Sequence, residues 1–220
     1  MDLIIFSCSP RPKNKSNTAV IVESFKNGFL SDGRLNVDIY YLYEHNEWDN
    51  FRKIFKENTD IIFALPLFVE CIPGLLMEFI ESLEPKNSKE IITKISFILQ
   101  GGFEEACQLR TCEKYLEKLP SYLNCKYNGT LIKGGMFALS FVSDNSRNKM
   151  LQLFFNMGER YAKDRTFEKT IVTKFAAPEK YSKLLCFIAI ILKPISKIAW
   201  IFLSRKLDAN GKLDARPYEI

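Results

Sequence analysis

Hydroxyl, amide and cationic side chains crowd the loop that follows the first apolar run of the chain. This loop, SCSPRPKNKSNTA at residues 7–19, comes directly after LIIF at residues 3–6 and leads into a helical pattern. The N-terminus of a helix attracts anions through its free N–H groups and its dipole, and arginine adds charged donors. The pattern therefore predicts a phosphate site formed by Ser9, Arg11, Ser16, Asn17 and Thr18.

A simpler interpretation is that Ser16 or Asn17 only caps the helix. Capping explains one residue rather than the whole set, so phosphate binding is favoured. Two well-known phosphate loops are excluded, because the Walker A and dinucleotide motifs need glycines and none precedes Gly28. A cysteine phosphatase would carry an arginine six residues after its nucleophile, where this chain has Asn14. We therefore expect Cys8 to be a small buried residue.

Two more loops follow apolar runs and have a different character. PLFVECIPG at residues 66–74 follows DIIFAL, and QGGF at residues 100–103 ends the run ISFILQ. A flat aromatic ligand could lie against the first of these loops, and Gly101 and Gly102 would let the backbone approach it closely. A plain turn explains the glycine pair equally well.

The elements that must position these loops alternate along the chain. Strands are predicted at residues 3–7, 37–42, 60–65, 95–100 and 127–132, and helices at residues 17–30, 49–57, 104–123 and 145–163, with one more beginning at Pro73. This alternation is typical of an α/β protein with a parallel sheet covered on both faces. Ligands of such sheets bind beyond the carboxyl ends of the strands, where all three loops should meet.

Composition narrows the class of protein further. The 220 residues suffice for one domain with some additional structure, and the net charge of +5 is too mild to favour nucleic acid as a partner. No export signal is evident, so the six cysteines, which form no C-x-x-C pair, are expected to be reduced thiols of a cytoplasmic protein. His45 is the only histidine, so we expect no metal site and no Ser-His-Asp triad.

Together the three loops resemble those of the flavodoxin-like NAD(P)H-dependent FMN reductases. That family has a GSPR…SNT loop for the FMN phosphate, a PLY…PG loop against the flavin ring and a GG loop at the ring edge, and the similarity covers residues 1–138. It implies a doubly wound, five-stranded parallel sheet in the order 2-1-3-4-5. Cys8 replaces the usual glycine and Phe68 the usual tyrosine.

Carried over by position, the resemblance divides the cofactor site into three parts. The first loop would hold the phosphate and ribityl chain of FMN. The flavin ring would face the second loop, and its polar edge the third. The residues that the resemblance adds to the phosphate set are Pro66, Leu67, Phe68 and Val69 from the second loop and Gly101, Gly102 and Phe103 from the third.

The resemblance also implies an activity, in which the protein supplies no catalytic residue because the flavin carries the chemistry. Hydride would come from NADH or NADPH, and electrons would pass to a small acceptor such as a quinone, a flavin, or a nitro or azo compound. A homodimer with the flavin at its interface is expected. Two alternatives stay open: an FMN-binding electron carrier that does not oxidise NAD(P)H, which the positive charge disfavours, and a scaffold that has lost the flavin.

The chain after the predicted FMN-binding domain, residues 1–175, has another composition. We expect residues 176–220 to form an apolar helical extension. The run LLCFIAIILKPISKIAWIFL approaches a membrane span in length, but two central lysines, at about 2.5–3.5 kcal/mol each, make insertion marginal. Packing against another subunit or the flavin domain is the favoured use. The alternative is contact of residues 180–206 with an anionic membrane surface, through a basic stripe of Lys180, Lys183, Lys193, Lys197 and Arg205.

Overall fold

A computed structural model describes residues 3–31, 33, 35–87, 92–192 and 201–202. The chain forms two compact units, Met1–Lys180 and Tyr181–Ile220. The first unit holds the sheet and all three loops. Lys193, Lys197 and Arg205 of the predicted basic stripe lie outside the described residues.

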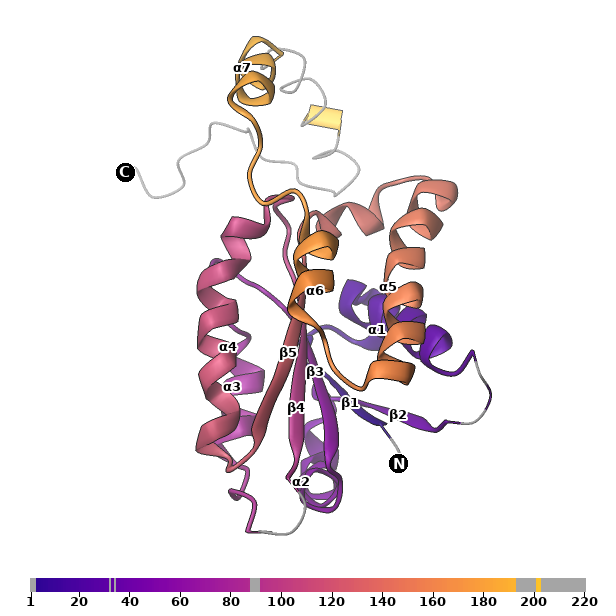
Figure 1. Ribbon diagram of the computed structural model, residues 1–220, viewed down its shortest axis with the longest axis vertical. Helices are drawn as coiled ribbons and strands as arrows, with labels where there is room; N and C mark the ends of the chain where they lie inside the picture. Colours follow the sequence, from indigo (N-terminus) through magenta and orange to yellow (C-terminus); the bar gives the residue numbers. More distant parts are fainter. Residues whose placement is uncertain (1–2, 32, 34, 88–91, 193–200, 203–220) are drawn as a thin grey trace. The chain divides into compact units, whose positions relative to one another are not determined.

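Five parallel strands form the sheet of the first unit, in the order β2-β1-β3-β4-β5 (Figure 1). The strands are β1 (Leu3–Ser7), β2 (Val37–Tyr41), β3 (Asp60–Pro66), β4 (Lys94–Gln100) and β5 (Lys126–Lys133). Each of the predicted strands is present, with ends that differ by at most one residue from the prediction. The order confirms the predicted flavodoxin-like fold.

Helices cover both faces of this sheet (Figure 1). On one face α1 (Asn17–Phe29) packs against α5 (Asp144–Asp164), and on the other lie α2 (Trp48–Glu57), α3 (Gly74–Glu81) and α4 (Arg110–Tyr122). In place of the one helix predicted at residues 104–123, the chain forms a 3-10 helix, Ala106–Leu109, which is followed directly by α4. Pro73, predicted to begin another helix, is the N-cap residue that precedes α3. Helix α6 (Lys169–Ala176), which packs beside β5, and the 3-10 helix Met136–Ser140 were not predicted.

The core explains why the central strands read as continuous apolar runs. Phe6, Phe63 and Phe97 share one register across β1, β3 and β4, and neighbouring ring centroids are 5.3 and 6.1 Å apart. Strands β1 and β3 are buried along their whole length, since both faces of the sheet are covered.

Helices α1 and α5 approach each other closely because two glycines face the partner helix. A Cβ atom at Gly28 would lie 1.9 Å from the carbonyl oxygen of Phe155, and one at Gly158 would lie 2.0 Å from that of Phe25. Any larger side chain at either position would force the helices apart. This contact fixes helix α1, whose first turn ends the phosphate-type loop.

The amino end of the sheet holds a closed network of buried polar groups. The Asp60 carboxylate accepts hydrogen bonds from the Tyr161 hydroxyl at 2.8 Å and from the Arg165 guanidinium at 3.1 Å. Asn128 donates to the Arg165 carbonyl and to Ser96 at 2.9 and 3.0 Å. Burial, with the Asp60 charge beside it, raises the pKa of Tyr161 well above its ordinary value, so the hydroxyl stays a donor. This network is structural.

The second unit contains helix α7 (Lys183–Ile191), whose N-terminus is capped by Ser182 accepting a hydrogen bond from the N–H of Leu185. Among the helices in the described ranges, none combines the length and the apolar character needed to cross a bilayer.

Candidate functional site

The first loop begins where β1 ends and is shaped by its own hydroxyl groups. The N–H of Cys8 donates to the carbonyl of Ala64 at 2.7 Å, which keeps the loop in line with β3. The Ser9 hydroxyl oxygen accepts from the N–H of Arg11 at 3.2 Å. Ser16 caps α1, because its hydroxyl oxygen accepts from the N–H of Ala19 at 3.2 Å. Helix capping, the simpler of the two interpretations of Ser16, therefore accounts for its observed contact.

Lys13 holds the outer part of this loop against helix α1. Its ammonium group lies 2.7 Å from a carboxylate oxygen of Glu23, which also accepts from the Tyr41 hydroxyl at 3.1 Å. Burial alone would raise the pKa of Glu23, but the hydrogen bonds from Lys13 and Tyr41 lower it below its ordinary value. Arg11 is different, because no carboxylate among the described residues pairs with it.

A cavity of about 300 Å³ opens where the three loops meet. One side is polar and belongs to the first loop and the start of α1. The other side is largely apolar and belongs to the ends of β3 and β4 and to the segment after β5. The residues around it are Ser9, Arg11, Asn17, Thr18, Pro66, Leu67, Phe68, Gln100, Gly102 and Phe137.

The structure thus brings eight of the twelve predicted site residues around one cavity and leaves four outside its lining. Ser16 serves as the helix cap. A Cβ atom at Gly101 would lie 2.9 Å from a methyl carbon of Leu109, so a larger residue there would require the Leu109 side chain to shift. Val69 and Phe103 are 96% and 77% exposed.

Residues 68–71 form a tight hairpin that places Phe68 beside the cavity. The N–H of Phe68 donates to the Cys71 carbonyl at 3.0 Å, and the N–H of Cys71 donates back at 2.9 Å. The two residues between them, Val69 and Glu70, have φ angles of 46° and 65°. Positive φ at both central positions is typical of a type I′ turn, and a β-branched residue there is strained. Such strain is characteristic of functional loops.

Gln100 and Phe137 line the cavity although sequence reasoning did not select them. The Gln100 amide donates to the Thr18 hydroxyl oxygen at 3.3 Å and so links the end of β4 to the start of α1. A polar residue at the end of an apolar strand was the available signal for Gln100. For Phe137, the signal was the GGMF stretch after the fifth strand.

Asn17 shapes the cavity through its side chain rather than facing it with free donors. Its amide nitrogen donates to the Met136 carbonyl at 3.0 Å, and its amide oxygen accepts from the Ser140 hydroxyl at 2.9 Å. These two bonds attach the 3-10 helix that carries Phe137 to the first loop. The backbone N–H groups of Asn17 and Thr18 belong to the first turn of α1, which has no intrahelical acceptors for them.

The two residues considered for nucleophilic or acid–base chemistry both lie in structural positions. The Cys8 thiol is fully buried and donates to the Phe6 carbonyl at 3.2 Å. Burial raises the pKa of Cys8 well above its ordinary value, so a reactive thiolate is disfavoured. The His45 ring stacks on Trp48, with ring centroids 4.7 Å apart. Neither residue lines the cavity.

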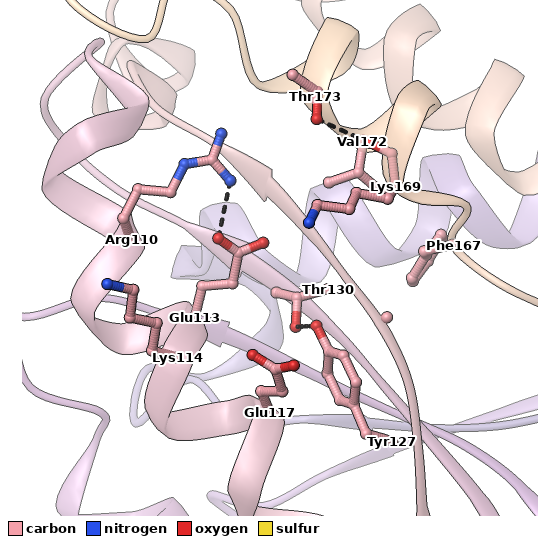
Figure 2. Close-up of a pocket in the computed structure, with 11 residues that line it drawn as sticks. Arg110, Glu113, Lys114, Glu117, Tyr127, Thr130, Phe167, Lys169, Val172 and Thr173 are labelled. Carbon is pink, nitrogen blue, oxygen red and sulfur yellow. Dashed lines mark hydrogen bonds and ion pairs between the residues drawn. The ribbon is translucent and has the colours of Figure 1, made fainter.

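A second cavity of about 300 Å³ lies at the outer edge of β5, between α4 and α6 (Figure 2). Some of its polar side chains are paired with protein groups, whereas those of Lys114, Glu117 and Lys169 make no hydrogen bond or ion pair within the described residues. Arg110 is hydrogen-bonded to Glu113 at 2.8 Å, and the Tyr127 hydroxyl donates to Thr130 at 2.9 Å. It lies along β5 and includes no residue of the three loops that follow β1, β3 and β4, where ligands of this fold bind. Volume does not distinguish the two cavities, but their places in the fold do, because only the first is lined by the three loops.

Comparison with solved structures finds azoreductases and an NAD(P)H:quinone oxidoreductase. An azoreductase from Bacillus anthracis str. Sterne is 15% identical, with a TM-score of 0.52 over 74% of this chain and 99% of the other. An FMN-dependent NADH-azoreductase from B. anthracis str. Ames Ancestor, solved with FMN, is 13% identical, with a TM-score of 0.54 over 76% of this chain and 100% of the other.

An NAD(P)H:quinone oxidoreductase from Methanothermobacter marburgensis is 17% identical, with a TM-score of 0.53 over 76% of this chain and 97% of the other. At these identities the likeness establishes the class of fold. No family model and no curated protein matches the chain.

Proposed function

We propose that this chain is an FMN-dependent oxidoreductase that takes hydride from NADH or NADPH and passes electrons to a small acceptor. The observation that carries the proposal is the division of the cavity into a donor-rich side at a helix N-terminus and an apolar side beside a strained hairpin. A ligand with a phosphate at one end and a flat ring at the other matches both sides. The similar structures whose names include azoreductase, quinone oxidoreductase and FMN support the same choice.

In this proposal the first loop binds the phosphate. The guanidinium of Arg11 and the first-turn N–H groups of Asn17 and Thr18 are the donors, and Ser9 adds a hydroxyl close to them. Ser16 contributes by fixing the helix start, and Asn17 by holding the Met136–Ser140 segment. All five residues selected from the sequence keep a role in this proposal. The side chains of two of them, Ser16 and Asn17, act mainly by holding other parts of the site in place.

The flavin ring lies against the apolar side in this proposal. Pro66, Leu67 and Phe68 offer it a surface, and Val69 stands at the hairpin tip beyond them. Gly102 borders the ring edge. A Cβ atom at this position would lie 3.7 Å from the Phe137 side chain, in van der Waals contact with it, and would occupy space that the glycine leaves for the ring. Gly101 and Phe103 shape the same turn.

Bound FMN would supply the hydride and electron transfer, so the protein needs no acid or base of its own. The chain's residues bind and orient the ring and exclude water from one of its sides. We propose quinones, flavins, and nitro or azo compounds as acceptors, and cytoplasm as the place of the reaction.

We also propose a homodimer that covers the site. Phe68, Val69 and Phe103 are exposed around the cavity, at 45%, 96% and 77%, and an apolar rim of this kind favours a protein partner. A fully active monomer at micromolar concentration, measured by light scattering, would contradict this part of the proposal.

One experiment separates the proposal from the electron-carrier and scaffold alternatives. FMN is added to the purified chain, free FMN is removed, and NADH or NADPH is supplied without air. Rapid loss of the yellow colour supports the reductase, and a stable yellow protein that only dithionite bleaches supports the carrier. A chain that retains no FMN would contradict both.

A further inference from the structure

Helix α7 of the second unit is apolar on every side. Residues 184–191, LLCFIAII, follow one another without a polar residue, and at about 100° per residue they make about two turns around the helix axis. Leu184, Phe187 and Ile190 expose 67%, 61% and 67% of their surface. A helix that is apolar all round normally lies in a protein core or in lipid.

The charges around this helix are of one sign. Residues 180–206 contain six of the chain's 31 Lys and Arg residues and none of its 26 Asp and Glu residues. Elsewhere acidic residues slightly outnumber basic ones, so this segment accounts for the positive net charge. Lys183 is the first residue of α7 and Lys180 precedes it by three residues, and both belong to the described residues.

A second copy of this chain suits this combination poorly. In a symmetric contact between two copies the same basic residues would lie near one another, and the segment offers no carboxylate to pair with them. An anionic bilayer supplies both an apolar layer and negative headgroups. Nine helical residues rise about 14 Å, less than half of a hydrocarbon core of about 30 Å, so α7 could lie in the surface but could not cross it.

We propose that α7, together with Lys180 just before it, binds the surface of anionic bilayers. The apolar side chains of α7 enter the boundary between headgroups and acyl chains, and Lys180 and Lys183 contact the phosphate groups. This contact goes beyond the proposed oxidoreductase activity and does not depend on it. If both hold, acceptors dissolved in the bilayer become accessible to the enzyme.

Flotation of the full-length chain with vesicles tests the proposal. Vesicles of phosphatidylcholine with phosphatidylglycerol should carry the chain upward in a density gradient, and vesicles of phosphatidylcholine alone should carry much less. Added salt should weaken the binding, because each lysine near an anionic surface contributes about a fivefold factor that salt screens. The binding should be the same with and without FMN, which separates this test from that of the enzyme activity.

Two variants, each with a matched control, locate the contact. Phe187→Ser should lower partitioning at least about tenfold, whereas Ile92→Ser, which alters a 63% exposed residue of the first unit, should leave it unchanged. Lys183→Glu should lower partitioning to anionic vesicles by more than about fivefold, and Lys118→Glu on α4 should not.

Three results would overturn the proposal. The chain could fail to float with anionic vesicles, or it could float equally with both vesicle types at any salt concentration. The third result would be that Phe187→Ser converts a dimer into a monomer, as measured by light scattering, without any change in vesicle binding. The apolar surface of α7 would then be a self-association interface.

Discussion

At the amino end of the sheet, Asp60 accepts hydrogen bonds from Tyr161 and Arg165, and Asn128 joins the same network. At the carboxyl end, Arg11 faces a cavity and pairs with no carboxylate in the described part of the chain, and the first-turn N–H groups of α1 have no intrahelical acceptor. Both ends hold polar groups at the edge of an apolar core.

The difference lies in where the partners of these groups come from. A buried polar group needs a partner, because an unmade hydrogen bond costs about 1–3 kcal/mol. The amino end finds its partners within the chain, so its network stabilises the fold. At the carboxyl end Arg11 is an exposed residue beside the cavity, and we propose that the FMN phosphate is its partner. The following variants test this division, from the largest expected effect to the smallest.

Asp60→Ala should lower the free energy of unfolding by about 3 kcal/mol, because it removes a buried charge that accepts from two side chains. Urea denaturation measures this loss. The dissociation constant of FMN should stay within about twofold of the original value. Asp49→Ala, at a carboxylate that is 86% exposed, is the control and should change stability by less than about 0.5 kcal/mol. A large loss of FMN affinity in Asp60→Ala would break the comparison.

Arg11→Ala should weaken FMN binding by about 1.5–3 kcal/mol, the range for a hydrogen bond to a charged group. Fluorescence titration with FMN and with riboflavin, which lacks the phosphate, measures the effect. Riboflavin affinity and the stability of the FMN-free chain should hardly change. Lys15→Ala, in the same loop, controls for general charge. Equal losses for the two ligands would contradict the phosphate assignment.

Asn17→Ala should lower the free energy of unfolding by about 1–2 kcal/mol, because its side chain makes two hydrogen bonds to the Met136–Ser140 segment. Thermal or urea unfolding without FMN measures this. Ser140→Ala removes one of the two bonds and should cost about half as much. The FMN affinity should fall less than in Arg11→Ala. A larger fall would show that the Asn17 side chain contacts the ligand directly.

Glu23→Gln should have the smallest effect, about 0.5 kcal/mol on stability, because its ion pair with Lys13 is partly exposed. The pKa of Glu23 is lower in the folded chain than in the unfolded one, so the pair stabilises the fold above the ordinary carboxyl pKa of about 4.3. This contribution disappears as the pH falls through the folded value. The difference between Glu23→Gln and the original chain should therefore vanish in acid. A difference that persists below about pH 3 would show that Glu23 acts through packing.

Much of the fold could be predicted from local pattern. Continuous apolar runs such as those of β1 and β3 are typical of strands buried on both faces, and glycine or proline marked several of their ends. The resemblance of three loops then predicted the strand order. Helix α6 was missed because only its contact with β5 and α5 distinguishes its short amphipathic pattern from a loop.

In the candidate site, too, some features could be predicted from local sequence and others depend on tertiary contacts. Residue types and spacing sufficed to select the loops, since a phosphate-type loop is recognisable from its donors and from the helix that follows. Which donors remain available was decided by contacts between residues far apart in the chain. Asn17 is committed to Met136 and Ser140, Lys13 to Glu23, and Ser16 to its own helix.

The sequence by itself determined the strands, most of the helices, the loops at their ends and the run of apolar and basic residues after residue 180. These depend on periodicity and on residue type, which are local properties. Only the tertiary structure decided that Gln100 and Phe137 join the cavity and that Gly101 lies against the Leu109 side chain. It alone also decided that Val69 stands in a left-handed turn. These facts depend on distances between segments that adjoin only when the sheet is formed, and no local pattern carries them.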